Sequence, residues 1–247
     1  MDMLKIGLSG LQTTQYGLVV ASNNIANANT EGYTRQELVT SSPSSIQIGD
    51  NYFGQGVYVG DVRRLGADYV EVALRDSLSS KAYNEHLYGL GVEMDKMLSD
   101  QDTGLDKSLQ KFFTSIGDLA NSPTSQATRS VVIDDLNGVG FKFASMKSVM
   151  DLSRSTIDKD LVNFSSQINS LAKDIVSIND AIVDSKVRTG DFSSQLLDSR
   201  YRALTALAEY VDIQVSDESD GSVQVYVAGG IGLITNNQVN EIEASPD

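Results

Sequence analysis

The sequence predicts a mainly α-helical protein with a small β part. The expected architecture is an N-terminal assembly helix, a rod domain of long helices arranged as a bundle or coiled coil, and the start of a β-rich outer domain. Three patterns predict it. Apolar residues recur every seven positions before residue 28, a seam between residues 132 and 182 alternates steps of four and three, and the apolar period drops to two after residue 211. With only three prolines in 247 residues, helices can run long.

The composition excludes several classes of function. Lys and Arg together number 19 against 33 Asp and Glu, and the net charge of -14 repels nucleic acid and anionic lipid. The chain has no cysteine, so disulfides and thiolate metal sites are excluded. Residues 1–20 lack the features of a cleaved secretory signal, and no apolar run reaches the length of a membrane span. We therefore expect no nucleic acid partner and no membrane insertion.

The first helix, expected over residues 2–28, carries an apolar seam that no other segment of the chain obviously covers. Its three glycines each cost about 1 kcal/mol relative to alanine, so the isolated helix is marginal and is expected to order on docking. We predict that this seam is the contact between subunits. The expected assembly interface is Leu4, Leu8, Leu11, Leu18 and Ile25.

The chain between residues 36 and 64 changes character. Ser and Thr are dense around Pro43, and glycines punctuate short alternating runs, which predicts extended chain and a hairpin. Helical spacing returns over residues 67–98. A short amphipathic helix is expected at residues 105–120, and Asn121-Ser122-Pro123 ends it.

The longest helix is expected over residues 125–186, about 90 Å at 1.5 Å per residue. Its apolar seam keeps heptad spacing, with a stutter near Ser153. An intramolecular bundle and an intermolecular coiled coil both explain this seam. We favour the bundle, because the helices around residues 83–97 and 105–120 supply partners within the chain.

After Gly190 a helix is expected over residues 193–210, followed by a hairpin that turns at Asp220-Gly221 and by short strands at residues 231–234 and 239–242. These are too few strands to close a sheet, so we expect the chain to be part of a longer protein. The predicted domains are 1–64 (axial helix, turn and extended linker), 65–190 (long-helix rod) and 191–247 (helix and incomplete β domain).

Residues for chemistry are scarce. His86 is the only histidine, with no nucleophile or orienting carboxylate at a recognisable spacing, so a solvated or packing role is favoured. The acidic segments after Asp100 and Asp217 lack the full calcium-loop pattern and fit turns better. We predict no catalytic, cofactor-binding or metal-binding residues, and no enzyme activity.

The segment from Asn23 to Gln36 resembles the signature of the bacterial flagellar axial proteins, the family of rod, hook and hook-associated subunits. Within it, the chain most resembles the N-terminal half of the hook-associated protein 1 family, at the hook-filament junction. Further matches are Gly54–Val59 with Val62-Arg63-Arg64, Ser108–Phe113, and Leu196–Arg200. The resemblance implies a signature turn built from Asn24, Asn27, Asn29, Gly32, Tyr33 and Arg35. Glu31 stands where proline is usual, which should loosen this turn.

The resemblance also implies a function. It predicts a structural subunit of the flagellum that contacts copies of itself, the hook protein, and the next hook-associated protein or filament subunits. It implies secretion by the flagellar type III export apparatus, with an export chaperone, and a C-terminal helix that pairs with the first helix. The alternatives are another axial subunit, of the hook or rod, and a secreted binding module.

Overall fold

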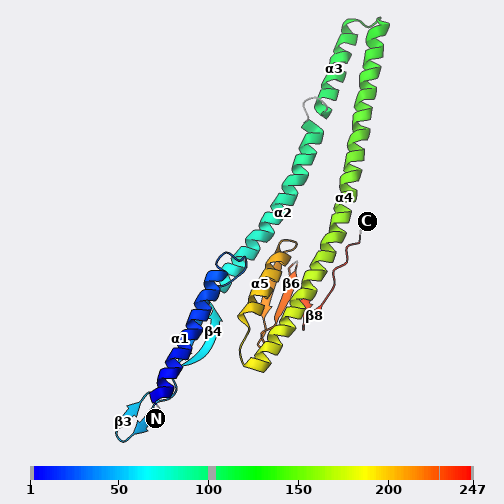
Figure 1. Ribbon diagram of the computed structural model, residues 1–247. Coiled ribbons are helices and arrows are strands. Elements are labelled where there is room, and N and C mark those ends of the chain that lie inside the picture. Colours follow the sequence, from blue (N-terminus) through cyan, green and yellow to red (C-terminus); the bar gives the residue numbers. More distant parts are fainter. Residues whose placement is uncertain (1–2, 100–103, 228, 246–247) are drawn as a thin grey trace. The chain divides into compact units, whose positions relative to one another are not determined.

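The structure is a computed structural model that describes residues 3–99, 104–227 and 229–245. Within these residues the helices are α1 (Met3–Ala26), α2 (Asp68–Ser99), α3 (Leu105–Asn121), α4 (Gln126–Thr189) and α5 (Ser194–Ala208) (Figure 1). Each lies within a few residues of its expected position. The mainly α-helical fold class with a small β part is therefore confirmed. The turn expected in the acidic segment after Asp100 falls on residues 100–103, which lie outside the described residues.

In the part of the chain that the structure describes, the strands form three antiparallel sheets. β1 (Gln36–Ser41) pairs with β4 (Tyr58–Arg64). In the chain segment that connects these two strands, β2 (Ile46–Ile48) pairs with β3 (Asn51–Phe53) as a separate sheet. The third sheet has the order β5-β6-β7-β8, built from β5 (Ile213–Asp217), β6 (Val223–Val227), β7 (Ile231–Thr235) and β8 (Gln238–Val239). Its β7–β8 turn places Asn236 and Asn237 at φ of 50° and 57°, as a two-residue hairpin turn requires. The expected Asp220-Gly221 hairpin is present.

Chain contacts divide the described residues into two compact units. The first unit takes the residues up to Ser79 together with Gln167–Ile242. The second takes Ser80–Ser166 and the residues after Ile242. Both α2 and α4 therefore contribute one part to each unit. The division at residues 64 and 190 that the sequence favours stays a prediction.

The core of the first unit lies between the C-terminal third of α4, α5 and the four-stranded sheet. Ile175 and Leu207 are fully buried there, and so are Val225 and Ile234 from the middle of the sheet. The strands contribute alternate residues: in β6, Val223, Val225 and Val227 all face the core. The apolar seam of α4 thus meets a sheet from Ile168 onward.

The second unit buries the same seam only in part. Val139 and Met146 are buried, whereas Leu136, Phe143 and Leu161 are each about half exposed, at 52%, 53% and 50%. The interpretation of the whole seam as a helical bundle core, covered by residues 83–97 and 105–120, is therefore wrong for its C-terminal part. The heptad pattern reports a buried helix stripe, and a sheet can cover such a stripe as well as another helix can.

His86 has the packing role that the sequence favours. Its ring lies edge-on to the ring of Phe164 in α4, with centroids 5.7 Å apart and an interplanar angle of 69°. This is a preferred geometry for aromatic pairs. In the same unit Lys111 of α3 forms an ion pair of 3.2 Å with the buried carboxylate of Asp135.

Candidate functional site: the first helix and the contacts that hold it

Helix α1 has two different faces. Along one face, part-buried residues recur at the spacing of a helix stripe, among them Thr13, Gly17 and Val20, and strands β1 and β4 lie against this face. At Gly17 the approach is close enough that an added Cβ would meet the Leu38 side chain at 3.9 Å. The expectation that no segment of the chain covers α1 is therefore wrong: the β1–β4 ribbon covers one side of it.

The opposite face of α1 carries the predicted assembly residues, and we call these five the exposed face. Leu4 and Ile25 at the two ends are 83% and 77% exposed, and Leu11 and Leu18 in the middle are 60% and 64% exposed. Leu8 is also exposed. Apolar side chains in such a row normally have a partner, because leaving them in water forgoes about 1.5 to 3 kcal/mol each.

Two polar contacts fix α1 to the linker that follows it. Near the start of the helix, the Ser9 hydroxyl accepts a hydrogen bond of 3.2 Å from the Val57 amide. Gly56 beside it has a φ of 97°, and an added Cβ there would lie 2.5 Å from the Ser9 oxygen, so only glycine allows this approach. Near the end of the helix, the contact is made by Asn24.

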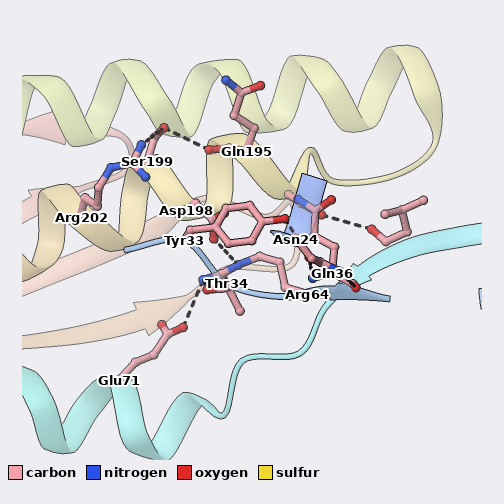
Figure 2. Close-up of polar contacts among 12 residues, drawn as sticks. Asn24, Tyr33, Thr34, Gln36, Arg64, Glu71, Gln195, Asp198, Ser199 and Arg202 are labelled. Atoms are coloured by element: carbon pink, nitrogen blue, oxygen red, sulfur yellow. Dashed lines mark hydrogen bonds and ion pairs between the residues drawn. The ribbon is translucent and has the colours of Figure 1, made fainter. Parts of the chain in front are cut away.

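Asn24 is the centre of the predicted signature turn (Figure 2). Its amide group donates to the Gln36 carbonyl and accepts from the Gln36 amide, each at 2.9 Å. The same oxygen accepts from the Tyr33 hydroxyl at 2.8 Å. The turn therefore brings the end of α1, the aromatic ring of Tyr33 and the start of β1 together through one side chain.

The other predicted turn residues have smaller roles. Asn27 donates to the Asn23 side chain, and Gly32 takes the positive φ of 71° that closes the turn. Arg35 contributes its backbone carbonyl, which accepts from the Leu65 amide at 2.9 Å, while its side chain and that of Asn29 are exposed. Despite Glu31, the turn is closed by a hydrogen bond of 3.2 Å from the Tyr33 amide to the Thr30 carbonyl.

A cluster of four residues, which we call the Arg64 cluster, holds this turn to the core of the first unit. Arg64 at the end of β4 donates to Asp198 of α5 at 2.8 Å, to Thr34 at 2.8 Å, and to Glu71 of α2 at 3.2 Å. Figure 2 shows these side chains converging from separate elements. Asp198 is only 3% exposed, so Arg64 supplies the charge that a buried carboxylate requires.

The same strand and helix meet at a second point. Ser194, one turn before Asp198 on α5, donates to the Val62 carbonyl at 3.1 Å. Ser194 and Asp198 are one helical turn apart and therefore lie on the same side of α5, the side that contacts β4. The signature turn also contacts α5 directly, because an added Cβ at Gly32 would overlap the Arg202 side-chain stem.

Burial shifts the pKa values of two side chains in this region. Burial raises the pKa of the Tyr33 hydroxyl, and the negative charge of Asp198 raises it further. Burial lowers the pKa of Arg200, and the nearby Asp217 carboxylate opposes that change. Tyr33 therefore stays protonated and keeps donating to Asn24 well above neutral pH.

The Arg64 cluster was not predicted from the sequence. Arg64 and Asp198 are 134 residues apart, and although both lie in segments that carry the family resemblance, no local pattern pairs them. The available signal was an acidic residue placed between the apolar positions of a helix, Leu197 and Leu204, where burial of the carboxylate would demand a cation.

The arrangement is suited to attachment. A cavity of about 250 Å³ lies beside the turn, lined by Gly32, Tyr33, Thr34, Gly66, Ala67, Val70, Glu71 and Tyr201. Its polar lining side chains are those of Tyr33, Thr34, Glu71 and Tyr201. Among the described residues no group of three or more His, Cys, Asp or Glu side chains is placed to bind a metal ion. None of the helices in the described segments combines the length and apolar character needed to span a bilayer.

Comparison with known families decides the relationship. The flagellar hook-associated protein FlgK helical domain matches residues 92–247, well over half of the chain. The chain belongs to this family. A second family, the flagella basal body rod protein, matches residues 4–34, which contain α1 and most of the signature turn. The FlgK family membership confirms the resemblance found in the sequence. The rod-protein match shows that the likeness to the wider group of axial proteins lies at the N-terminal end.

Curated relatives agree with the family. Flagellar hook-associated protein 1 of Salmonella typhimurium (strain LT2) is 28% identical over 246 residues, covering 99% of this chain and 44% of the relative. The Bacillus subtilis (strain 168) protein of the same name is 26% identical, covering 93% of this chain and 47% of the relative. The chain thus spans less than half the length of the curated relatives it matches.

A solved structure shares the fold. The flagellar hook junction protein FlgK from Burkholderia pseudomallei superposes with a TM-score of 0.60 at 19% sequence identity. The match covers 72% of this chain and 30% of that chain. At this identity the likeness establishes the fold that FlgK proteins and this chain share.

Proposed function

We propose that this chain is a structural subunit of the bacterial flagellum at the hook-filament junction, and that it assembles through the exposed face of α1. One observation carries the proposal. The linker side of α1 is fixed by Ser9 and Asn24, so the helix presents Leu4, Leu8, Leu11, Leu18 and Ile25 to solvent in a defined orientation. Because β1 and β4 lie against α1, the helix need not order on docking, and a preorganised apolar face loses less entropy on binding than a flexible one.

The partners follow from this role. The exposed face contacts further copies of the chain, and the subunits above and below are the hook protein and the next hook-associated protein or the filament. Both the family membership and the names of the relatives support this assignment. The subunit reaches the flagellum through the type III export apparatus, with an export chaperone, and works without enzyme activity.

The three sequence-based domains take separate roles in this proposal. Residues 1–64 supply the axial contacts, residues 65–190 form the helical rod, and residues 191–247 begin an outer β domain. The Arg64 cluster joins the first of these to the third, because Arg64 in β4 pairs with Asp198 in α5. Load on the axial helix therefore passes to the core through an ion pair and not through the linker backbone alone.

Substitution of the exposed face tests the proposal. We expect Leu11→Gln with Leu18→Gln to keep the helix content measured by circular dichroism, because both side chains already face water. The same double variant should fail to incorporate into flagella and should no longer self-associate in analytical ultracentrifugation. Matched controls are Val187→Gln and Ile231→Gln, at 79% and 64% exposure on other elements.

The results separate the candidate functions. Normal incorporation of the α1 double variant, or equal loss in the control variants, would refute assembly through this face. A hook or rod subunit is the nearest alternative, supported by the rod-protein match over residues 4–34, and it would place the chain within the hook or rod in labelled flagella. A secreted binding module would remain monomeric at every concentration.

A further inference from the structure

The turn between β5 and β6 contains a dipeptide with its own chemistry, Asp220-Gly221. Gly221 has a φ of 98°, and an added Cβ would overlap the ring of Phe192. Any other residue would therefore meet both backbone strain and a steric clash. The fold requires glycine after Asp220, although this makes the dipeptide chemically labile.

The lability comes from the missing side chain. In an Asp-Gly pair the glycine nitrogen can attack the aspartate Cγ, forming the N–Cγ bond of a five-membered imide and releasing the carboxyl oxygen as water. Water then adds to either imide carbonyl. Opening at one carbonyl restores aspartate, and opening at the other routes the backbone through Cγ, giving isoaspartate. The reaction needs only water, a protonated carboxyl group and a glycine N–H that can lose its proton.

The structure opposes the last two of these requirements. The Asp220 carboxylate accepts hydrogen bonds from the Ser222 hydroxyl at 2.7 Å and from the Ser222 amide at 2.8 Å. These bonds lower the pKa of Asp220, so its carboxyl is less often protonated. The attacking nitrogen is also occupied, because the Gly221 amide donates to the Glu218 carbonyl at 3.0 Å.

We propose that Asp220-Gly221 is a site of spontaneous isoaspartate formation, and that Ser222 and the Glu218 carbonyl hold it inactive while the β5–β6 hairpin is closed. Opening of the hairpin releases both restraints together. The modification then marks chains in which this sheet has opened.

The change would not be silent, because the turn is attached to two helices. The Gly221 carbonyl accepts from Arg200 of α5 at 2.6 Å, and Val223, two residues later, is paired with Asn179 of α4. An isoaspartate at 220 lengthens the backbone of the turn by one carbon. It therefore displaces the carbonyl of Gly221 from Arg200 and shifts the start of β6 against the buried Asn179.

The test measures isoaspartate at position 220 in the full chain. Folded protein and protein in urea are incubated at neutral pH and body temperature, and peptides covering the turn are scored by isoaspartyl methyltransferase labelling and by electron-transfer fragmentation. We expect the folded chain to react more than about tenfold more slowly than the unfolded chain, because opening of the hairpin must precede reaction.

Variants separate protection by Ser222 from general folding. Ser222→Ala should raise the folded rate several-fold and leave the rate in urea unchanged, while Ser222→Thr, which keeps the hydroxyl, should behave as wild type. Ser219→Ala is the matched control in the same turn, since Ser219 contacts Lys186 through its carbonyl. Asp220→Glu should give no signal, because glutamate does not readily form the five-membered ring.

Two outcomes would overturn the proposal. One is equal isoaspartate formation in folded and unfolded wild-type chain, a comparison that needs no variant to fold. The other is a Ser222→Ala chain that is folded by circular dichroism and reacts no faster than wild type.

Discussion

The side-chain amide of Asn24 pairs with both backbone polar groups of Gln36, as a neighbouring strand would. Its Nδ2 donates to the Gln36 carbonyl and its Oδ1 accepts from the Gln36 amide. A helix end and a strand start are thereby joined without a continuous sheet. Asparagine is suited to this because its amide carries one acceptor oxygen and two donor hydrogens, the same chemistry as a peptide group.

Helix α4 makes the same contact twice. Asn179, fully buried, pairs with the amide and carbonyl of Val223, at 3.3 and 3.0 Å. Ten residues earlier, Asn169 pairs with the amide and carbonyl of Ile242, each at 2.9 Å. These paired bonds satisfy backbone groups at places where the sheet provides no partner strand. The fold of the first unit thus depends on three asparagines that the hydrophobic pattern does not mark.

Substitutions at Asn24 should separate its roles. We expect Asn24→Ala to lower the free energy of unfolding by about 2 to 3 kcal/mol. The substitution removes the amide oxygen that accepts two hydrogen bonds and the amide NH2 group that donates a third. Asn24→Asp keeps the acceptor oxygen and should cost about half as much. Urea denaturation measures both, and Asn27→Ala, whose bonds are exposed, serves as control. Equal losses at Asn24 and Asn27 would contradict this role.

Two adjacent arginines offer a matched comparison. Arg64→Met should cost about 3 kcal/mol, because it leaves the buried Asp198 carboxylate without its cation. Arg63→Met breaks an ion pair with Glu37 whose side chains are 60% and 47% exposed, and should cost less than about 1 kcal/mol. Chemical denaturation of both variants checks this. Similar stabilities for the two variants would show that the Arg64 cluster does not hold the turn to the core.

Gly32 and Gly49 share a backbone conformation and differ in surroundings. Both have positive φ, 71° and 63°, but nothing lies within 4 Å of an added Cβ at Gly49. We expect Gly49→Ala to cost about 1 kcal/mol from backbone strain alone, and Gly32→Ala to cost more because it meets Arg202. Adding Arg202→Ala should bring Gly32→Ala near the Gly49 value. Thermal unfolding of the two single variants and the double variant measures this double-mutant cycle. Additive losses of stability would count against a contact between residue 32 and Arg202.

Truncating a residue of the apolar seam of α4 should cost more stability in the first unit than in the second. Ile175→Ala is expected to cost about 3 kcal/mol, because the side chain is fully buried against α5 and the sheet. Leu161→Ala, half exposed in the second unit, should cost less than about 1 kcal/mol in the isolated chain. Denaturant titration with a tertiary-structure probe distinguishes them. Equal costs would mean that the seam is covered alike along its length.

The raised pKa of Tyr33 predicts a pH dependence. Its contribution to stability is fully present below about pH 10, the ordinary tyrosine pKa, and is lost as pH rises through the higher value in the folded state. The free energy of unfolding should therefore fall less steeply in Tyr33→Phe than in wild type between about pH 9 and 11. Identical slopes in wild type and Tyr33→Phe would contradict the prediction.

Local patterns predicted most of the elements. The seven-residue spacing of Leu4, Leu11 and Leu18 predicted α1 and its exposed face, because residues seven apart lie on the same side of a helix whatever surrounds it. Period-two spacing and the Asp220-Gly221 dipeptide located the β5–β6 hairpin in the same way. The signature around Tyr33 located the turn. Each of these is fixed by residues close together in the chain.

Side-chain periodicity and backbone preference are local properties, so they were enough to predict the helices, the hairpins and the apolar side of each. What covers each apolar side became clear only from the folded chain: a sheet over the end of α4, and a ribbon of two strands over one side of α1. The folded chain likewise revealed the contact of Arg64 with Asp198 across 134 residues. Burial and ion pairing depend on distance in space, whereas a periodic pattern carries no record of its distant partner.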